Sequence, residues 1–352
     1  MPEKFFHSLD LRSHENCKYQ VVNSSFPTGD YGLPPFSIMG AGRSITGSFF
    51  GNGTTVLQLS SASRLMELDV PSQQIRVSAS VTVAEVYNFL VSRGFFLNGL
   101  PSYPGVSIGG CIAANVHGQN HYQEGCFGRN LVSFLLGHPE YGLKKVSPEI
   151  NQGLFDLTVG GFGLTGLILE ATFRVIPLKT DVLDVSVRQF GTIFECYEML
   201  LAEKDTADFF HSWADLTHLS HKGEQGFFLR GIFDNKSEIG ATRVREEPGG
   251  RSHLRWKPQL FSSPVLGLIN HYYYFSNTYQ PRASKPLAKF IFPSANRLWY
   301  FSMFGAQGLI EHQVLIPHEA VKGYLAKLKK ILLEKRPLIT LCHLKLFSGE
   351  QK

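Results

Sequence analysis

Alternating apolar and polar residues predict β-strands in the first half of the chain. Residues 74–81 (QIRVSASV) and 167–175 (LILEATFRV) alternate with a period of two, which is typical of a strand with one solvated face. Residues 55–59 (TVLQL) form a nearly continuous apolar run, which predicts a buried strand. Residues 36–48 begin as an apolar run and then break into a glycine turn. The pattern predicts a sheet-rich region with short connections.

A helix is predicted directly after the strand at 74–81. Thr82 followed by Glu85 has the spacing of a capping box, and Gly94 suits the end of the helix. The apolar residues between these two ends fall on one helical face: Val83, Val86, Tyr87 and Leu90. This segment therefore predicts a helix that packs on the neighbouring strand.

The second half of the chain has a different pattern. Glycine becomes sparse after Pro177, and residues 178–316 are rich in Phe and Tyr. The run at 312–317 (HQVLIP) resembles a strand and precedes a helix that is predicted to begin near His318. The change of pattern places a domain boundary near residue 178.

Composition and charge indicate the number of domains and argue against a nucleic-acid partner. The chain has 352 residues, 43% of them hydrophobic, and domains usually hold roughly 100 to 200 residues, so about two domains are expected. The formal net charge is +5, and Lys and Arg are scattered among 29 acidic residues except at 322–336. A nucleic-acid surface needs a denser basic stripe, so we expect no nucleic-acid partner.

Cysteine usage and hydropathy bear on the compartment. The chain has an odd number of widely spaced cysteines without a CxxC pair: Cys17, Cys111, Cys126, Cys196 and Cys342. This pattern argues against a disulfide framework and favours a reducing compartment. The N-terminus lacks the apolar core of a signal peptide, and the chain has no 18-residue apolar run. We therefore expect a cytoplasmic protein with at most peripheral contact with the inner membrane.

Three glycine clusters indicate a ligand held by backbone. They lie at 40–44 (GAGRS), 105–120 (GVSIGGCIAANVHGQN) and 160–166 (GGFGLTG), each beside a predicted strand. The first cluster does not fit a dinucleotide fingerprint, because Ile45 stands at the sixth position, nor a Walker A loop, because Ser48 replaces the lysine. Alone, it is equally compatible with an ordinary turn. Together, the clusters favour one extended ligand with a pyrophosphate and a flat ring.

The order of these motifs resembles the PCMH-type FAD-binding domain of the vanillyl-alcohol oxidase superfamily, and in particular its oxidases of polyprenyl-phosphate-linked ribose. The resemblance is strong from about Phe36 to Pro177 and traceable to Phe347. It implies an α+β fold with a two-lobed FAD-binding domain at residues 1–178. An α+β substrate domain with an antiparallel sheet would follow at residues 179–352.

The resemblance implies which residues contact FAD. Those implied for the pyrophosphate are Gly40, Ala41, Gly42, Arg43 and Ser44, and those implied for the flavin are Ser107, Gly109, Gly110, Ala113, His117, Gly118 and Asn120, with Ile168 near the adenine. In several relatives a histidine at the position of Arg43 bonds covalently to the flavin. Arginine cannot form that bond, so we expect non-covalent FAD.

Three residues are candidates for catalysis. His117 is the first choice for the base that takes the hydroxyl proton, because imidazole exchanges protons near neutral pH. A structural role in the glycine-rich turn is its alternative. Gln313 and Lys345 match positions that line the substrate pocket of the family, although Lys345 is equally compatible with a strand residue in solvent. Trp213 is either a wall of that pocket or core.

Other positions depart from the family pattern. Gln119 stands where the ribose oxidases have lysine, Glu311 replaces a glutamine and Met39 replaces an arginine. His117 and His121 are four residues apart, but the sequence between them lacks the HExxH pattern, so we expect no metal site.

The resemblance implies an FAD-dependent oxidoreductase that oxidises a sugar hydroxyl, with a polyprenyl-phosphate-linked pentose as one candidate substrate and a reductase for the keto product as a candidate partner. An alditol or aldonolactone oxidase is the alternative. In the family, a segment after the position of Phe347 supplies a cysteine and a catalytic lysine, whereas this sequence ends at Lys352. A third interpretation is therefore an inactive flavoprotein remnant or a partner subunit, and on either view we expect poor activity and a marginal fold for the isolated chain.

Overall fold

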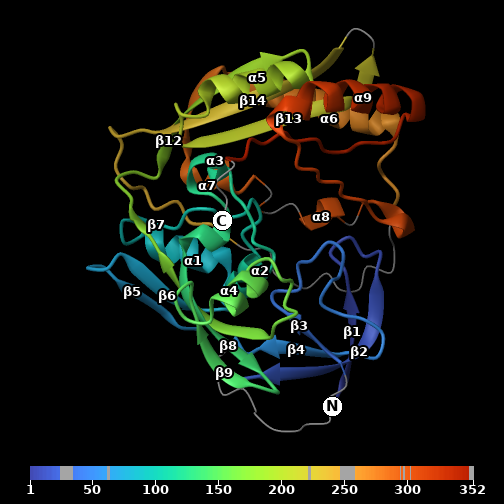
Figure 1. The fold of residues 1–352 in the computed structure, drawn as a ribbon. Helices are drawn as coiled ribbons and strands as arrows, with labels where there is room; N and C mark the ends of the chain where they lie inside the picture. Colours follow the sequence, from blue (N-terminus) through green and yellow to red (C-terminus); the bar gives the residue numbers. More distant parts are fainter. Residues whose placement is uncertain are drawn as a thin grey trace.

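The structure is a computed structural model that describes residues 1–23, 35–61, 64–220, 223–245, 258–293, 295, 298–301 and 303–348. Figure 1 shows two groups of elements. One group holds the strands from β1 to β10, and the other holds the sheet of β12 to β15 with helices α5, α6 and α9. The fold is α+β, as the resemblance implied, and the domain boundary near residue 178 stays a prediction.

The first sheet has four strands in the order β1-β2-β4-β3: Glu3–His7, His14–Val22, Thr55–Leu59 and Phe36–Met39. Strands β1 and β2 pair antiparallel, whereas β4 runs parallel to both β2 and β3. The predicted strand at 55–59 is confirmed, and the apolar run that begins at residue 36 forms β3. Because β3 ends at Met39, the first glycine cluster begins directly at the end of a strand.

The second sheet has five antiparallel strands in the order β5-β6-β10-β8-β9: Met66–Asp69, Gln74–Ser78, Leu167–Arg174, Leu131–His138 and Gly142–Val146. The predicted strands at 74–81 and 167–175 correspond to β6 and β10. A short pair, β7 (Phe95–Phe96) and β11 (Ile176–Pro177), lies outside this sheet.

Helix α1 (Val83–Val91) confirms the capping prediction. The Thr82 hydroxyl accepts from the Glu85 N–H, and the Glu85 carboxylate accepts from the Thr82 N–H. The predicted apolar face is buried. Gly94 adopts a φ of 76°, a conformation that ends helices readily. Shorter helical segments of the same region are α2 (Ile108–Ala113), α3 (His121–Glu124), the 3-10 turn Phe127–Asn130 and α4 (Gln152–Thr158).

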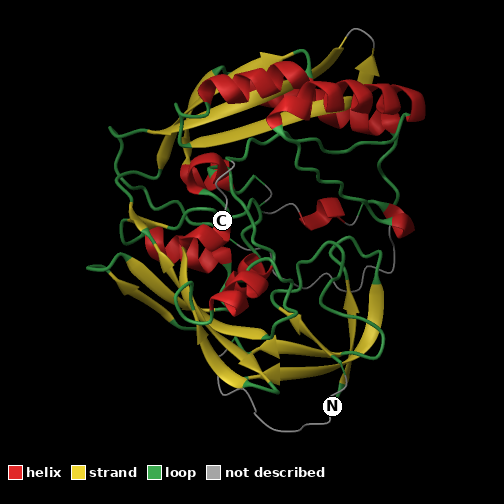
Figure 2. Cartoon of the chain, viewed as in Figure 1, coloured by secondary structure: helices red, strands yellow, loops and turns green. Residues whose placement is uncertain are grey.

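The third sheet is antiparallel, in the order β13-β14-β12-β15: Phe209–Ser220, Gly223–Phe233, Val182–Phe190 and Arg282–Pro286. Helices lie against it in Figure 2. They are α5 (Ile193–Glu203), α6 (Ser263–Thr278) and α9 (Val321–Lys335), and the shorter α7 (Leu287–Ile291), α8 (Leu298–Phe301) and 3-10 turns Gly305–Gln307 and His318–Ala320 complete the chain. The helix predicted near His318 is confirmed. Residues 312–317 are not a strand, because their backbone pairs with no strand of the described chain.

A shared apolar core joins the two groups of elements. Tyr87 of α1 packs edge-on against Phe292 with ring centroids 5.3 Å apart, and Phe96 packs edge-on against Phe209 of β13 at 6.3 Å. The Asn88 side chain exchanges two hydrogen bonds with the backbone of Val244, at 2.9 and 2.8 Å. These contacts fix the position of β13 over the loop that follows α2, which is where the candidate catalytic residues lie.

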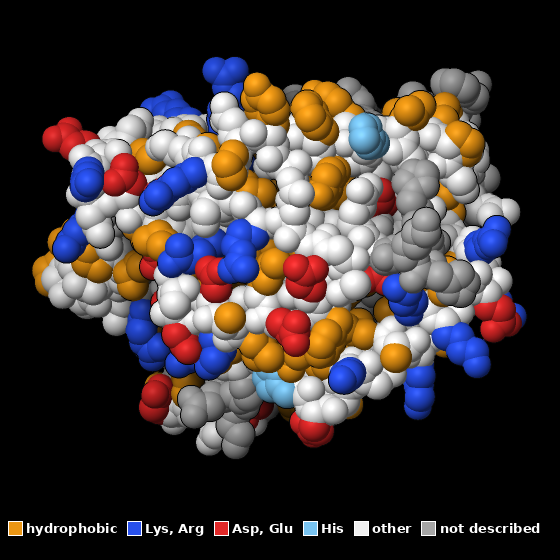
Figure 3. All heavy atoms as spheres, turned by 90° about the horizontal axis from the view of Figure 1, so that it is seen from above, with side chains coloured by type: hydrophobic (Ala, Val, Ile, Leu, Met, Phe, Trp, Pro, Cys, Tyr) orange, Lys and Arg blue, Asp and Glu red, His pale blue; other side chains and the backbone are white. Residues whose placement is uncertain are grey.

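Among the described residues, the structure contains no helix of the length and apolarity needed to cross a bilayer. Figure 3 views the molecule from the end that carries α5 and α9. On this face Lys and Arg side chains are interspersed with acidic and apolar ones and form no continuous basic stripe.

Candidate functional site

A cleft of about 120 Å³ brings the three glycine clusters together. We call it the glycine cleft, and it lies where the ends of β3, β4 and β6 meet α2 and the loop before β10. Its lining includes residues from each cluster: Gly40, Ala41, Gly109, Gly110, Ala113, Gly163 and Gly166. Ile168, implied for the adenine side, also lines it. Three segments far apart in sequence therefore form one backbone-lined surface.

Residue 40 must be glycine, because the backbone there packs closely against a neighbouring side chain. A Cβ at this position would overlap the Ser107 hydroxyl oxygen. Ser107 caps α2, and its Oγ accepts hydrogen bonds from the N–H groups of Ala41 (3.2 Å) and Gly110 (3.3 Å). The Gln58 side chain donates to the Gly40 carbonyl at 3.0 Å from β4. The first glycine cluster is therefore held by side chains of two other segments.

Gly42 and Arg43 directly follow Ala41 in the sequence, although neither of them lines the glycine cleft itself. Gly42 has a φ of 67°, and Gly163 of the cleft lining has a φ of 82°, in the region that favours glycine. The buried Nε of Arg43 has no hydrogen-bond partner, and its guanidinium lies 6.0 Å from the centre of the Tyr103 ring. A buried unpaired guanidinium nitrogen is expensive unless a ligand accepts from it, and a pyrophosphate is such a ligand. The residues present therefore fit the diphosphate of a dinucleotide cofactor.

A second group of polar side chains lies between α3 and β13. We call it the His–Lys cluster, and its members are His117, Gln119, His121, His211, His343 and Lys345. The first three come from the segment 117–121, His211 comes from β13, and the last two come from the segment 342–346. The Ser212 hydroxyl ties that last segment to β13, since it accepts from the Leu344 N–H and donates to the Leu344 carbonyl.

Lys345 and His117 form the central contact of the cluster, with Nζ and Nδ1 3.1 Å apart. Burial lowers the pKa of Lys345 to about 8. Burial, and then the nearby Lys345 charge, lowers the pKa of His117 to about 4. At neutral pH the ammonium group therefore donates to a neutral imidazole, whose own proton is on Nε2. Lys345 can therefore change its protonation state just above neutral pH, with His117 as its hydrogen-bond acceptor.

The rest of the cluster carries unpaired polar atoms. Gln119 Nε2 lies 3.3 Å from His211 Nδ1 and also donates to the Ser102 hydroxyl at 3.2 Å. Gln119 Oε1 and the Nε2 atoms of His121 and His211 are buried without a hydrogen-bond partner. Burial is the main cause that lowers the pKa of each of these histidines, to about 3 for His121. A polar ligand or water would satisfy these atoms.

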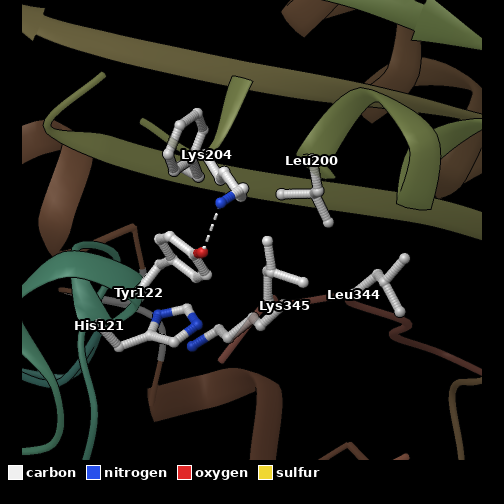
Figure 4. A pocket seen from close by; sticks show the side chains of 8 residues that line it. His121, Tyr122, Leu200, Lys204, Leu344 and Lys345 are labelled. Carbon is white, nitrogen blue, oxygen red and sulfur yellow. Dashed lines mark hydrogen bonds between the residues drawn. The ribbon is translucent and has the colours of Figure 1, made fainter. Parts of the chain in front are cut away.

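Figure 4 shows a small pocket beside the cluster. The Lys345 side chain runs toward the His121 imidazole, and Leu344 and Leu200 form apolar walls. Lys204 lies on the far side and donates to the Tyr122 hydroxyl at 3.0 Å. Two lysines thus border this pocket, and Lys345 is the one that reaches the histidines.

The structure places the other predicted residues as follows. Gly118 approaches the Leu100 carbonyl, and Asn120 bonds to Asn98 and Gly99, so both shape the loop that carries His117. Ser44 bonds to Thr46 and Ser48 on the surface. Gln313 has an exposed side chain that donates to Glu311. Trp213 is buried and stacks on Phe227, as a core residue does.

Sequence reasoning did not identify Gln58, His211 or His343. Only Gln58 had a signal in the sequence. It is a polar residue in an otherwise apolar strand, and a half-buried glutamine side chain there needs a hydrogen-bond partner. His211 and His343 are single histidines without a motif. Their proximity follows from the pairing of the segment 342–346 with β13, which the pattern did not predict.

Comparisons with known proteins bear on the cofactor of this chain. Residues 30–138 match the FAD binding domain family. The chain is 25% identical to the decaprenylphosphoryl-beta-D-ribose oxidase of Mycolicibacterium smegmatis over 81% of this chain and 64% of that protein. It is 28% identical to a Streptomyces coelicolor protein of uncharacterised function over 51% of this chain and 48% of that protein.

A third relative is the D-arabinono-1,4-lactone oxidase of Eremothecium gossypii, 27% identical over 40% of this chain and 25% of that protein. The chain thus spans less than two thirds of the length of each of these relatives. The family match covers the first two glycine clusters and the loop of His117, and the third cluster completes the same cleft. The chain therefore carries a PCMH-type FAD-binding domain, and its cofactor is FAD.

Proposed function

We propose that this protein is an FAD-dependent oxidoreductase that oxidises a secondary hydroxyl of a sugar, with Lys345 as the base. The contact between Lys345 and His117 supports the proposal most directly, because Lys345, with a pKa of about 8, lies 3.1 Å from a residue of the segment that the resemblance implies for the flavin. FAD, when bound, accepts the hydride that leaves the carbinol carbon. What the chain must supply is removal of the hydroxyl proton and placement of that carbon.

Lys345 is better suited to take the proton than His117. A general base works best when its pKa is close to the working pH, and the pKa of about 8 for Lys345 is much closer than the pKa of about 4 for His117. The neutral amine accepts the hydroxyl proton as the carbon–hydrogen bond breaks. His117 Nδ1 then accepts a hydrogen bond from the ammonium group that results. In this proposal His117 positions the lysine, instead of acting as the base itself.

The unpaired atoms of the cluster would orient the substrate. Gln119 Oε1 and His121 Nε2 can accept from sugar hydroxyls, because the proton of the neutral His121 ring is on Nδ1 and donates to the Gly118 carbonyl. The Nε2–H of His211 can donate to a sugar oxygen, because its Nδ1 accepts from Gln119. Buried polar groups that need a partner discriminate strongly for substrates that supply it. A polyhydroxylated ring meets that requirement.

The names of two relatives support the substrate class. One is an oxidase of a lipid-linked ribose and the other an oxidase of a sugar lactone. A polyprenyl-phosphate-linked pentose is the first candidate substrate, and the keto product would then need a reductase partner. The lactone oxidase relative supports an aldonolactone as the second candidate. Arg43 disfavours that second candidate, since the resemblance implies a flavin-linking histidine at its position.

Anaerobic mixing of the FAD-loaded protein with candidate sugars tests the proposal. Polyprenyl-phosphoryl ribose, an aldonolactone and an alditol are added separately, and loss of the flavin absorbance band is followed. We expect loss of the flavin band with one of these compounds. Lys345→Met should slow that loss about 10²- to 10⁴-fold, the usual contribution of a general base. Bleaching at the wild-type rate in Lys345→Met would remove the role proposed for this lysine.

A further inference from the structure

Helix α6, which covers part of the third sheet (Figure 1), presents an apolar stripe to the outside of the protein. The stripe consists of large apolar side chains that are 41% to 74% exposed: Val265, Leu268, Ile269, Tyr272, Phe275 and Tyr279. Their spacing of three and four residues places them on one side of the helix. From residue 259 to residue 281 the sequence contains no Asp, Glu, Lys or Arg. The outer face of a surface helix is usually polar or charged, so this one is exceptional.

The opposite side of α6 fixes the direction in which the α6 stripe points. The buried residues of the helix are Leu266, Gly267 and Asn270. The Asn270 side chain donates to the buried Asp215 carboxylate of β13 at 2.8 Å, and Tyr273 packs edge-on against Trp213 with ring centroids 5.1 Å apart. Rotation of the helix would leave that buried carboxylate with one hydrogen bond fewer, at a cost in free energy. The α6 stripe therefore stays exposed unless another molecule covers it.

The α6 stripe belongs to the side of the third sheet that carries the His–Lys cluster. Alternate residues of a strand share one face, so Trp213 and His211 of β13 point to the same side. Trp213 contacts α6 through Tyr273, and His211 belongs to the cluster. Phe210, which points the other way, packs with Leu200 of α5 on the opposite face. A molecule that covers the stripe is therefore on the same side of the sheet as the cluster.

We propose that the α6 stripe docks on the surface of a phospholipid bilayer. Its size argues against a second copy of the chain. A helix of this length is about 24 Å long, and a stripe about 10 Å wide covers roughly 240 Å². Each partner in a stable protein interface buries roughly 800 Å². A helix that lies in the headgroup region with one apolar face needs no larger area.

The composition of the stripe also favours a bilayer. Tyr272 and Tyr279 combine an apolar ring with a hydroxyl, and such side chains are enriched where a membrane meets water. No carboxylate of α6 would repel lipid phosphates, and the first charged residue after the helix is a cation. That residue, Arg282, pairs with Asp184, and its side chain is 76% exposed, so its guanidinium can also meet a phosphate.

Docking would bring the His–Lys cluster close to lipids. A polyprenyl-phosphate-linked pentose, the first candidate substrate, has its polyprenyl chain in a bilayer. The presentation of that substrate from the bilayer rests on the proposed function. Contact between the α6 stripe and the bilayer does not, because it is argued from the helix alone.

Flotation with phospholipid vesicles tests the inference without a substrate. The FAD-loaded protein is mixed with vesicles of equal parts phosphatidylcholine and phosphatidylglycerol, and the protein that rises with them in a density gradient is measured at low and high salt. The test variant is Leu268→Gln/Phe275→Gln. Its matched control is Leu157→Gln/Ile331→Gln, because Leu157 of α4 and Ile331 of the lysine-rich α9 are 67% and 54% exposed, against 74% and 58% for the test pair.

We expect the wild type and the control to bind the vesicles at both salt concentrations, because salt does not screen the burial of apolar surface. Leu268→Gln/Phe275→Gln should weaken binding about tenfold or more, since two large apolar side chains no longer enter the lipid. Its melting temperature and FAD content should match those of the wild type, because both side chains are exposed.

Three results would overturn the inference. The first is a wild type that does not float with the vesicles. The second is binding that high salt abolishes or that the control loses equally, which would assign the contact to another surface such as α9. The third is a concentration-dependent dimer that Leu268→Gln/Phe275→Gln abolishes, which would make a second copy the occupant. None of these results bears on sugar oxidation, which the loss of the flavin band measures separately.

Discussion

The glycine cleft and the His–Lys cluster are built on opposite principles. The cleft is lined mostly by backbone and small side chains, and its geometry depends on positions such as Gly40 where a Cβ has no room. The cluster consists of titratable side chains from three segments, and its properties come from burial, which shifts the pKa values of Lys345 and His117. In the proposed function, cofactor binding depends on the first region and proton transfer on the second, so a substitution can damage one without the other.

The largest effect is expected at the cleft. Gly40→Val should abolish FAD retention, because the new side chain collides with Ser107, the residue that caps α2. Gly153→Ala is the matched control, since a Cβ at Gly153 meets nothing within 4 Å. The flavin content of the purified proteins measures the outcome. Full flavin content in folded Gly40→Val would refute the packing argument.

A change at the cluster should leave the cofactor in place. Lys345→Met should retain FAD and reduce the rate of flavin reduction about 10²- to 10⁴-fold, whereas Lys330→Met, on the exposed face of α9, should change neither. Rapid-mixing absorbance under anaerobic conditions gives the rate, and acid precipitation should leave the flavin in the supernatant. Loss of FAD from Lys345→Met would show that the two regions are not separable.

The burial of His117 also predicts how the free energy of unfolding changes at acidic pH. The pKa of His117 is about 4 in the folded protein, below its ordinary value of about 6.5 in an unfolded chain. Between these values the unfolded chain binds more protons, so the free energy of unfolding should fall as the pH decreases through this window. His117→Gln should flatten this part of a denaturant-unfolding series. An unaltered pH slope in that variant would contradict the burial of His117.

The smallest effect is expected at Glu311. Its charge raises the pKa of Lys345, opposing the larger effect of burial. Glu311→Gln should therefore lower that pKa and move the rise of the reduction rate to a lower pH, while the plateau rate stays the same. A pH–rate profile for both proteins measures this shift. A shift of the pH–rate profile toward higher pH in Glu311→Gln would mean that Glu311 does not act on Lys345 through its charge.

The sequence predicted the glycine cleft better than the His–Lys cluster, because the cleft is built from local motifs. Gly40 directly follows β3, Gly163 lies in the loop before β10, and Gly109 lies in α2. The geometry that each of these glycines imposes on the backbone is local to its own motif. The capping box of Thr82 and the strands β4, β6 and β10 were predicted because their patterns are also local.

The cluster depends on pairing between residues far apart in the chain. Lys345 had been equally compatible with a solvent-exposed strand, and only the contact of the segment 342–346 with β13 turns it toward His117. His211 reaches the same place because β13 lies over the loop of Gln119, whose carbonyl accepts from the Phe210 N–H at 2.9 Å. No local pattern encodes such contacts. The strand expected at 312–317 is wrong, because a short run of consecutive apolar residues does not ensure a pairing partner.

The central claim is that FAD held in the glycine cleft places its flavin against the His–Lys cluster. A pH titration of the visible absorbance of the bound flavin tests this claim directly and needs no substrate. The account predicts a spectral change with a midpoint near the Lys345 pKa of about 8, present in the wild type and absent from Lys345→Met. A spectrum that stays constant between about pH 6 and about pH 9, or that titrates identically in Lys345→Met, would contradict it.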